Sequence, residues 1–208
     1  MWRPDFRVAI KIVDVSRETT LSVLNDSPIV LPTPLSHVEV GLSAIDPDDP
    51  SNRYANDPAS GLTYPLPPGW RRRTEDLVEP FTCAISNDTG ALVGSGRWDH
   101  LLAARPSSDE LIAGAAWLAS EYGEFFLPFE GDRVDVVMEE TTLAGLPAAR
   151  AGYRLVFHPE DGEPAYVRVL VVAVRSDQIS FLMAVAPDAE ARTVESILAG
   201  AHPADPDA

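Results

Sequence analysis

Three consecutive arginines, Arg71 to Arg73, are the most concentrated basic group in the sequence. A guanidinium pairs with carboxylates and phosphates through a planar fork of N–H donors, so such a group can bind an anion or an acidic partner surface. The alternative is a solvated turn in which the arginines pair with Glu75 and Asp76, because a charge run on one segment is usually a solvated face. Arg71, Arg72 and Arg73 are our candidate partner-binding residues.

The four histidines, His37, His100, His158 and His202, do not have the spacing of a catalytic or metal-binding set. Asp99 precedes His100, but a catalytic relay depends on contacts in space and not on adjacency in the chain. The sequence contains no nucleophile elbow, phosphate-binding loop or dinucleotide fingerprint. It therefore predicts no catalytic residues, no cofactor and a protein that is not an enzyme.

Two further features bear on metal binding. Cys83 is the single cysteine, so neither an internal disulfide nor a thiolate metal cluster can form, and a buried inert thiol is expected. The acidic segment 46–49 suggests a calcium loop, but Pro50 and Ser51 stand where that loop needs a ligand and a turn glycine. No metal site is predicted.

Aromatic residues gather between positions 117 and 129. They could line a ligand cavity, but at helical spacing they are more typical of a core, and we expect them to be buried. These residues are Trp117, Tyr122, Phe125, Phe126 and Phe129.

One helix carries most of these rings. Ser107 and Glu110 have the spacing of a capping box, and Pro128 cannot continue a helix, so the helix should occupy residues 107–126. Apolar residues recur along it at alternating steps of four and three, which places them on one face that should be buried. They are Leu111, Ala115, Leu118, Tyr122 and Phe125.

Strands are predicted on both sides of this helix, and a second helix is expected at 188–199. The last two strands are nearly continuous apolar runs joined by a short connection, so they should form a central antiparallel pair. The pattern predicts an α+β fold with an antiparallel sheet flanked by helices. The first strand lies in LTYPLPPGW at 62–70 and ends in a Pro-Gly turn, and the other strand ranges are 81–86, 91–98, 133–143, 148–157, 166–174 and 179–186.

The chain divides into a main domain at 61–201, an irregular N-terminal extension at 1–60 and a polar, flexible tail at 202–208. Within the extension, residues 6–15 and 37–44 could be strands. Residues 46–59 are rich in Asp, Pro and Asn and are expected to be a loop or linker.

The formal net charge is -16, from 32 acidic and 16 basic residues. Such a surface repels phosphate backbones and anionic lipids, so nucleic acid and anionic membranes are not expected as partners.

No apolar run approaches the length of a membrane span. The first 15 residues do not have the apolar core of a signal peptide. The protein is therefore expected to be cytoplasmic unless an upstream export segment is missing from this sequence.

Three motifs carry a family resemblance: PLPPGW at 65–70, the Gly96-Arg97-x-Asp99 strand end and GEFFLPFEG at 123–131. With the order of strands and helices around them, residues 64–201 resemble the secreted alanine- and proline-rich fibronectin-attachment proteins of high-GC Gram-positive bacteria. The resemblance implies the PsbP-like fold, an α/β/α sandwich. It also implies an extracytoplasmic, non-enzymatic protein that binds a protein partner.

The resemblance also implies a place for the fibronectin contact, an Arg-Trp-Phe-Val segment on the strand before the C-terminal helix. Residues 178–181 occupy that place and read Gln-Ile-Ser-Phe. The arginine and tryptophan, residue types that often anchor interfaces, are missing, and the following run is typical of a buried central strand. We therefore expect weak fibronectin binding or none.

Three functions remain open after this reading. The first is an extracytoplasmic binding or adhesion-type domain whose partner is an unidentified protein. The second is a cytoplasmic protein-partner scaffold of the same fold, and the third is an enzyme with an unrecognised cleft. A fold by itself does not decide among them, because functional sites are grafted onto folds.

Overall fold

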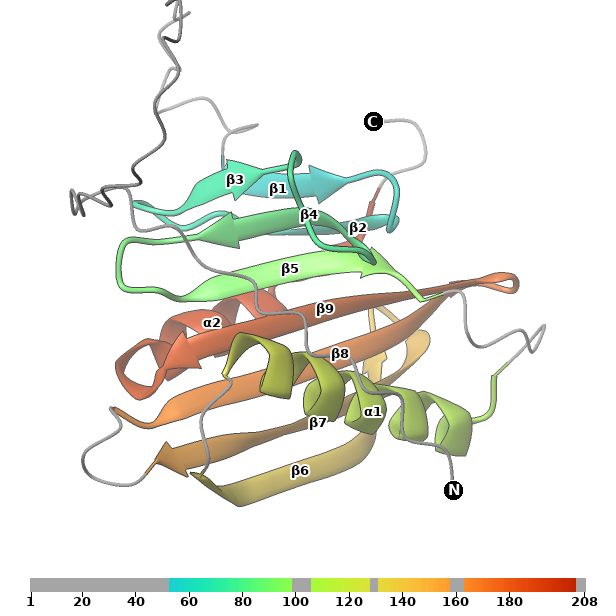
Figure 1. The fold of residues 1–208 in the computed structure, drawn as a ribbon. Coiled ribbons are helices and arrows are strands. Elements are labelled where there is room, and N and C mark those ends of the chain that lie inside the picture. The colour runs from blue at the N-terminus through green and yellow to red at the C-terminus, as the bar shows by residue number, and fades with distance from the viewer. Residues whose placement is uncertain (1–52, 99–105, 128–130, 158–162, 205–208) are drawn as a thin grey trace, which may run out of the picture. The chain divides into compact units, whose positions relative to one another are not determined.

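The computed structural model describes residues 53–98, 106–127, 131–157 and 163–204 (Figure 1). The helices in this part of the chain are α1 (Ser108–Phe126), the 3-10 turn η2 (Asp188–Glu190) and α2 (Ala191–Ala199). The strands are β1 (Tyr54–Asp57), β2 (Leu62–Pro65), β3 (Arg71–Arg73), β4 (Phe81–Ser86), β5 (Leu92–Arg97), β6 (Gly131–Leu143), β7 (Leu146–Phe157), β8 (Ala165–Arg175), β9 (Gln178–Pro187) and β10 (His202–Pro203).

Seven of these strands form one antiparallel sheet in the order β3-β4-β5-β9-β8-β7-β6. The predicted pair of apolar strands, β8 and β9, lies in its interior, as expected for runs that are covered on both faces. A second, three-stranded sheet has the order β1-β2-β10. The predicted fold class, an α+β protein with an antiparallel sheet flanked by helices, is confirmed.

Alternate residues of the large sheet supply two separate cores. On β9, Phe181, Met183 and Val185 belong to the cluster beneath α1, whereas Leu182 and Ala184 belong to the cluster that contains residues of α2 and β2. This alternation follows from the two-residue period of a strand. In Figure 1, α1 crosses one face of the sheet, with α2 on the other side of β9.

The sequence signals at the start of α1 are confirmed. The Ser107 hydroxyl accepts a hydrogen bond from the Glu110 backbone N–H, and the Glu110 carboxylate accepts one from the Ser107 backbone N–H at 2.7 Å. These two bonds form the capping box, which satisfies N–H groups that a helix start otherwise leaves without partners.

Two short strands differ from the sequence predictions. The prediction of a loop over 46–59 was wrong for Tyr54–Asp57, which pair with β2 as strand β1. The expected flexible tail was wrong at its start, because His202 and Pro203 pair with the other side of β2. Both strands are short and are held by pairing with distant residues, which local sequence patterns do not reveal. The division of the chain at residues 60 and 61 stays a prediction.

Candidate functional site

The three candidate arginines form strand β3 at one edge of the large sheet, and not the turn that was the alternative prediction. All three are exposed. Arg71 Nη2 lies 3.6 Å from Asp88 Oδ2, with 80% and 83% of the two side chains exposed, so this ion pair contributes little stability. Arg72 donates a hydrogen bond to the carbonyl oxygen of Asn56 and so ties β3 to β1.

This arrangement separates the roles of the three side chains. Successive residues of a strand point to opposite faces, so Arg71 and Arg73 share one face and Arg72 lies on the other. Because Arg72 contacts β1, Arg71 and Arg73 are the better candidates for an external contact. The part of the chain that the structure describes thus presents a short, strongly basic sheet edge.

A buried polar cluster lies near the start of the described chain. Asp57 Oδ2 accepts hydrogen bonds from the hydroxyls of Thr82 and Ser95, each at 2.6 Å. The Ser95 hydroxyl is also 3.1 Å from the Tyr64 hydroxyl. Asp57, Ser95 and Tyr64 are all buried, so the cluster joins β1, β2, β4 and β5 from within.

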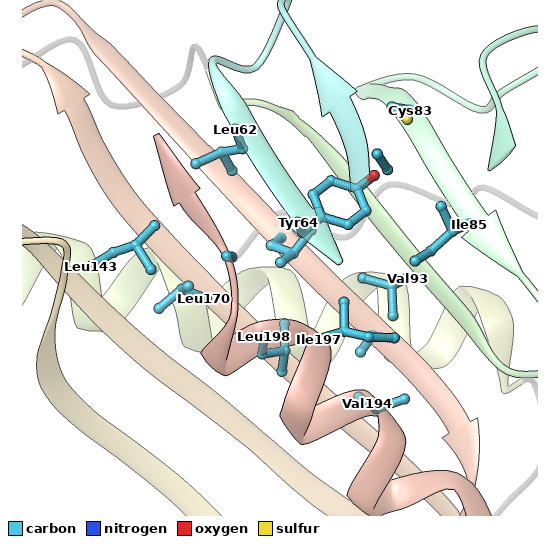
Figure 2. Close-up of a cluster of buried hydrophobic side chains, with 14 of the residues drawn as sticks. Leu62, Tyr64, Cys83, Ile85, Val93, Leu143, Leu170, Val194, Ile197 and Leu198 are labelled. Atoms are coloured by element: carbon cyan, nitrogen blue, oxygen red, sulfur yellow. The ribbon is translucent and has the colours of Figure 1, made fainter. Parts of the chain in front are cut away.

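A carboxylate, a hydroxyl and a phenol in contact could suggest a catalytic site, but their burial favours a structural role for this cluster. Burial, more than the nearby Cys83, raises the pKa of Tyr64 far above its ordinary value of 10.0, so the phenol stays protonated near neutral pH. Figure 2 shows the Tyr64 ring among the apolar side chains that surround it, including Leu62, Ile85 and Ile197. Sequence reasoning missed this cluster because its members lie far apart in the chain.

The other sequence candidates are mostly outside the described residues. This applies to His37, His100, His158, Asp99, Phe129, the acidic segment 46–49 and the two possible strands before residue 45. His202 is exposed, and its ring meets the edge of Tyr54 at 5.9 Å. Cys83 is buried, as predicted. Among the described residues, no group of three or more His, Cys, Asp or Glu side chains could hold a metal ion.

The aromatic residues of α1 divide between core and surface. Tyr122 and Phe126 are half-buried and pack against the core, but Trp117 and Phe125 are 44% and 38% exposed. The prediction of a wholly buried set was therefore wrong for Trp117 and Phe125. Trp117 lies outside the predicted apolar face of the helix. Phe125 is exposed because the buried face turns around the helix, from Leu111 at its start to Gly123 near its end.

Segment 178–181, where the resemblance places a fibronectin contact, is confirmed as part of a buried central strand. Ile179, Ser180 and Phe181 are buried. The Ser180 hydroxyl donates to the carbonyl oxygen of Ser60 at 2.5 Å. Strand β9 lies between β5 and β8, so its backbone edges are also covered.

Fold and surfaces together define a PsbP-like α+β domain with a basic sheet edge and an aromatic helix face. The family model of the fibronectin-attachment protein (FAP) domain matches residues 54–181. This match covers more than half of the chain, so the protein belongs to the fibronectin-attachment protein family. No curated protein matches the sequence significantly.

Two solved structures are similar to this chain at low sequence identity, and the first of them shows the same fold. The solution structure of cyanobacterial PsbP (CyanoP) from Synechocystis sp. PCC 6803 is 12% identical, with a TM-score of 0.51 over 78% of this chain and 98% of that chain. LpqN of Mycobacterium tuberculosis, a protein involved in cell envelope biogenesis, is 15% identical, with a TM-score of 0.46 over 69% of this chain and 83% of that chain. No helix among the described residues is long and apolar enough to cross a membrane.

Proposed function

We propose that this protein is a non-enzymatic, adhesion-type domain that binds a protein partner outside the cytoplasm. The observation that supports this function most directly is the family match. It begins at β1, contains α1 and ends within β9, so it takes in most of the fold and not one shared motif. The proposal requires neither a cofactor nor a metal.

Fibronectin itself is proposed to bind weakly or not at all, because the matching segment on β9 is buried. The test is surface plasmon resonance of the full chain over immobilised fibronectin. Submicromolar affinity that persists when the salt concentration is raised well above physiological levels would contradict this. A weak signal that disappears in salt would not, because an acidic protein associates nonspecifically with basic patches.

The partner contact is proposed at Arg71 and Arg73 on the basic edge. A partner captured from the cell envelope of the native host should be lost when both residues are changed to Glu. The matched control reverses the same number of charges at two other exposed arginines, Arg175→Glu with Arg192→Glu, and should retain the partner. If the double variant retained the partner as well as the control did, the basic edge would not be the contact.

The location outside the cytoplasm has a test of its own. Protease added to intact cells of the native host should degrade the protein, while a cytoplasmic marker survives. Survival of the protein in intact cells, with degradation after lysis, would favour the alternative, a cytoplasmic protein-partner scaffold of the same fold.

A further inference from the structure

The solvent side of α1 carries aromatic rings at positions where an amphipathic helix normally carries polar side chains. Trp117, Glu121 and Phe125 are spaced four residues apart, so they form one row along the helix, which we call the α1 row. All three are exposed. A carboxylate therefore stands between two exposed aromatic rings.

Neighbouring rings hold the α1 row in place. Trp117 stacks on the buried Trp98, with ring centroids 6.2 Å apart and an interplanar angle of 14°. Tyr122 meets Trp117 edge-on at 6.5 Å and Phe125 edge-on at 6.4 Å. The Tyr122 hydroxyl donates to the backbone carbonyl of Glu79 at 3.2 Å. Rings fixed in this way lose little conformational freedom when a partner binds.

The charge around the rings is negative. Glu121 precedes Tyr122 in the chain, and Glu79 accepts the hydrogen bond of its hydroxyl. Burial is the first cause of the raised pKa of Tyr122, and the charges of Glu79 and Glu121 are the next. Glu124 is already paired with Arg133 at 2.6 Å. For Glu121, the described part of the chain supplies no such ion pair. The complement of this surface is a cation.

We infer that the α1 row is a docking surface for an arginine on an exposed segment of a partner protein. A guanidinium can stack on the face of Trp117 or Phe125 while its N–H groups pair with the Glu121 carboxylate. A lysine ammonium pairs only as a point charge, which makes arginine the better fit. An anionic membrane is disfavoured because the same carboxylates repel it.

This surface goes beyond the proposed function, because it is separate from the basic edge on β3 and has the opposite charge. The two surfaces can be tested independently. Arg71 and Arg73 would meet carboxylates of a partner, whereas the α1 row would receive a partner's arginine. Loss of either interaction leaves the residues of the other intact.

The experiment follows the indole N–H signals of the four tryptophans in the full-length chain by NMR. The signal of Trp117 is assigned with Trp117→Phe. The probe is a blocked Gly/Ser peptide with three arginines, and the matched peptide carries citrulline, which keeps the shape of arginine but lacks its charge. We expect a saturable shift of the Trp117 signal with the arginine peptide alone.

Two variants separate the α1 row from general charge. Glu121→Gln should weaken binding by about two- to fivefold, the range of an exposed ion pair, because both aromatic rings remain. Asp88→Asn removes the same charge from the exposed turn beside Arg71 and should leave binding unchanged. Both positions are on the surface, so thermal melts should show that both variants fold.

Four results would overturn the inference: no saturable shift, an equal response to citrulline, an equal loss in Asp88→Asn, or full binding by Glu121→Gln. A shift of the Trp117 signal with protein concentration alone would assign the α1 row to a second copy of the chain. A shift caused by phosphatidylglycerol vesicles and not by the peptide would assign it to a membrane. Either of these outcomes also rejects the arginine-bearing partner.

Discussion

Gly114 is the residue on which the position of Trp98 depends. A Cβ atom at this glycine would lie 1.8 Å from Cζ3 of Trp98, far inside contact distance. The close approach lets the indole of Trp98 pack against α1, and the stacked Trp117 rests on it. One small residue on the helix therefore supports part of the exposed aromatic surface.

Gly114→Ala should destabilise the protein by about 1–3 kcal/mol, the usual cost of overpacking a core. The sign of this change in the free energy of unfolding is informative, because in an exposed helix interior alanine is more favourable than glycine by about 1 kcal/mol. Urea unfolding measures the difference. In a Trp98→Ala background the clash is removed, so the same substitution should be neutral or stabilising. Stabilisation by Gly114→Ala alone would show that Trp98 does not pack at this site.

At the scale of elements, the capping box of α1 supports a prediction about pH. Ser107→Ala removes the side-chain cap and should cost about 0.5–2 kcal/mol.

The backbone and hydroxyl of Ser107 lower the pKa of Glu110 below its ordinary value of 4.5. A carboxylate with a lowered folded-state pKa stabilises the fold above its unfolded pKa, and this stabilisation is lost as pH falls through the folded value.

Glu110→Gln should therefore be less stable than the unsubstituted protein at pH 7 and should approach it in stability below pH 4.5, as Glu110 becomes protonated. Chemical denaturation at a series of pH values measures both curves. Part of the deficit of Ser107→Ala should persist in acid, because the bond from the Glu110 backbone N–H to the Ser107 hydroxyl does not titrate. A constant deficit of Glu110→Gln across this range would contradict the linkage to the cap.

Local signals explain which elements the sequence predicts correctly. The cap at Ser107 and the apolar period of α1 are local features, as are the strands predicted at 81–86 and 91–98, and all of them appear in the structure. Strands β1, β3 and β10 are two to four residues long and depend on partners distant in the chain. No periodic pattern is readable over so few residues.

The candidate site was only partly predictable for a similar reason. Helical periodicity places Phe125 with Leu111 on a buried face, but periodicity assumes that the same side of the helix contacts the sheet along its whole length. In the structure, Ala119 and Gly123 take over that contact near the end of α1, and Phe125 is turned outward. Tyr153, from a strand far along the chain, packs closely against Gly123 and donates a hydrogen bond to the Ala119 carbonyl, contacts that helical periodicity does not reveal.

At the scale of the whole molecule, the two candidate surfaces have opposite charge within a chain of net charge -16. A basic partner segment is attracted by the whole molecule as well as by the α1 row, so its association should slow as salt is added. An acidic surface that approaches Arg71 and Arg73 meets overall repulsion instead. Binding at the basic edge thus depends on short-range ion pairs, because the electrostatic field of the whole protein opposes the approach of an acidic partner.

The last prediction concerns where the folded unit begins. The sequence predicts a main domain that begins at residue 61, but strand β1 argues for an earlier start, since Ala55 and Asp57 are buried. A chain that begins at residue 53 keeps both, and it should melt within a few degrees of the full-length protein. A chain that begins at residue 61 loses the acceptor of the Thr82 and Ser95 hydroxyls.

The loss of this charged acceptor costs about 1–3 kcal/mol, and the loss of β1 also uncovers apolar surface on β2. The 61–208 chain should therefore unfold at a much lower urea concentration than the 53–208 chain, or fail to fold. Asp57→Ala in the full-length protein is the matched control, because it removes the acceptor and keeps the strand. If 61–208 were as stable as 53–208, β1 would not be integral to the domain. If 53–208 did not fold, residues 1–52 would contribute to its stability.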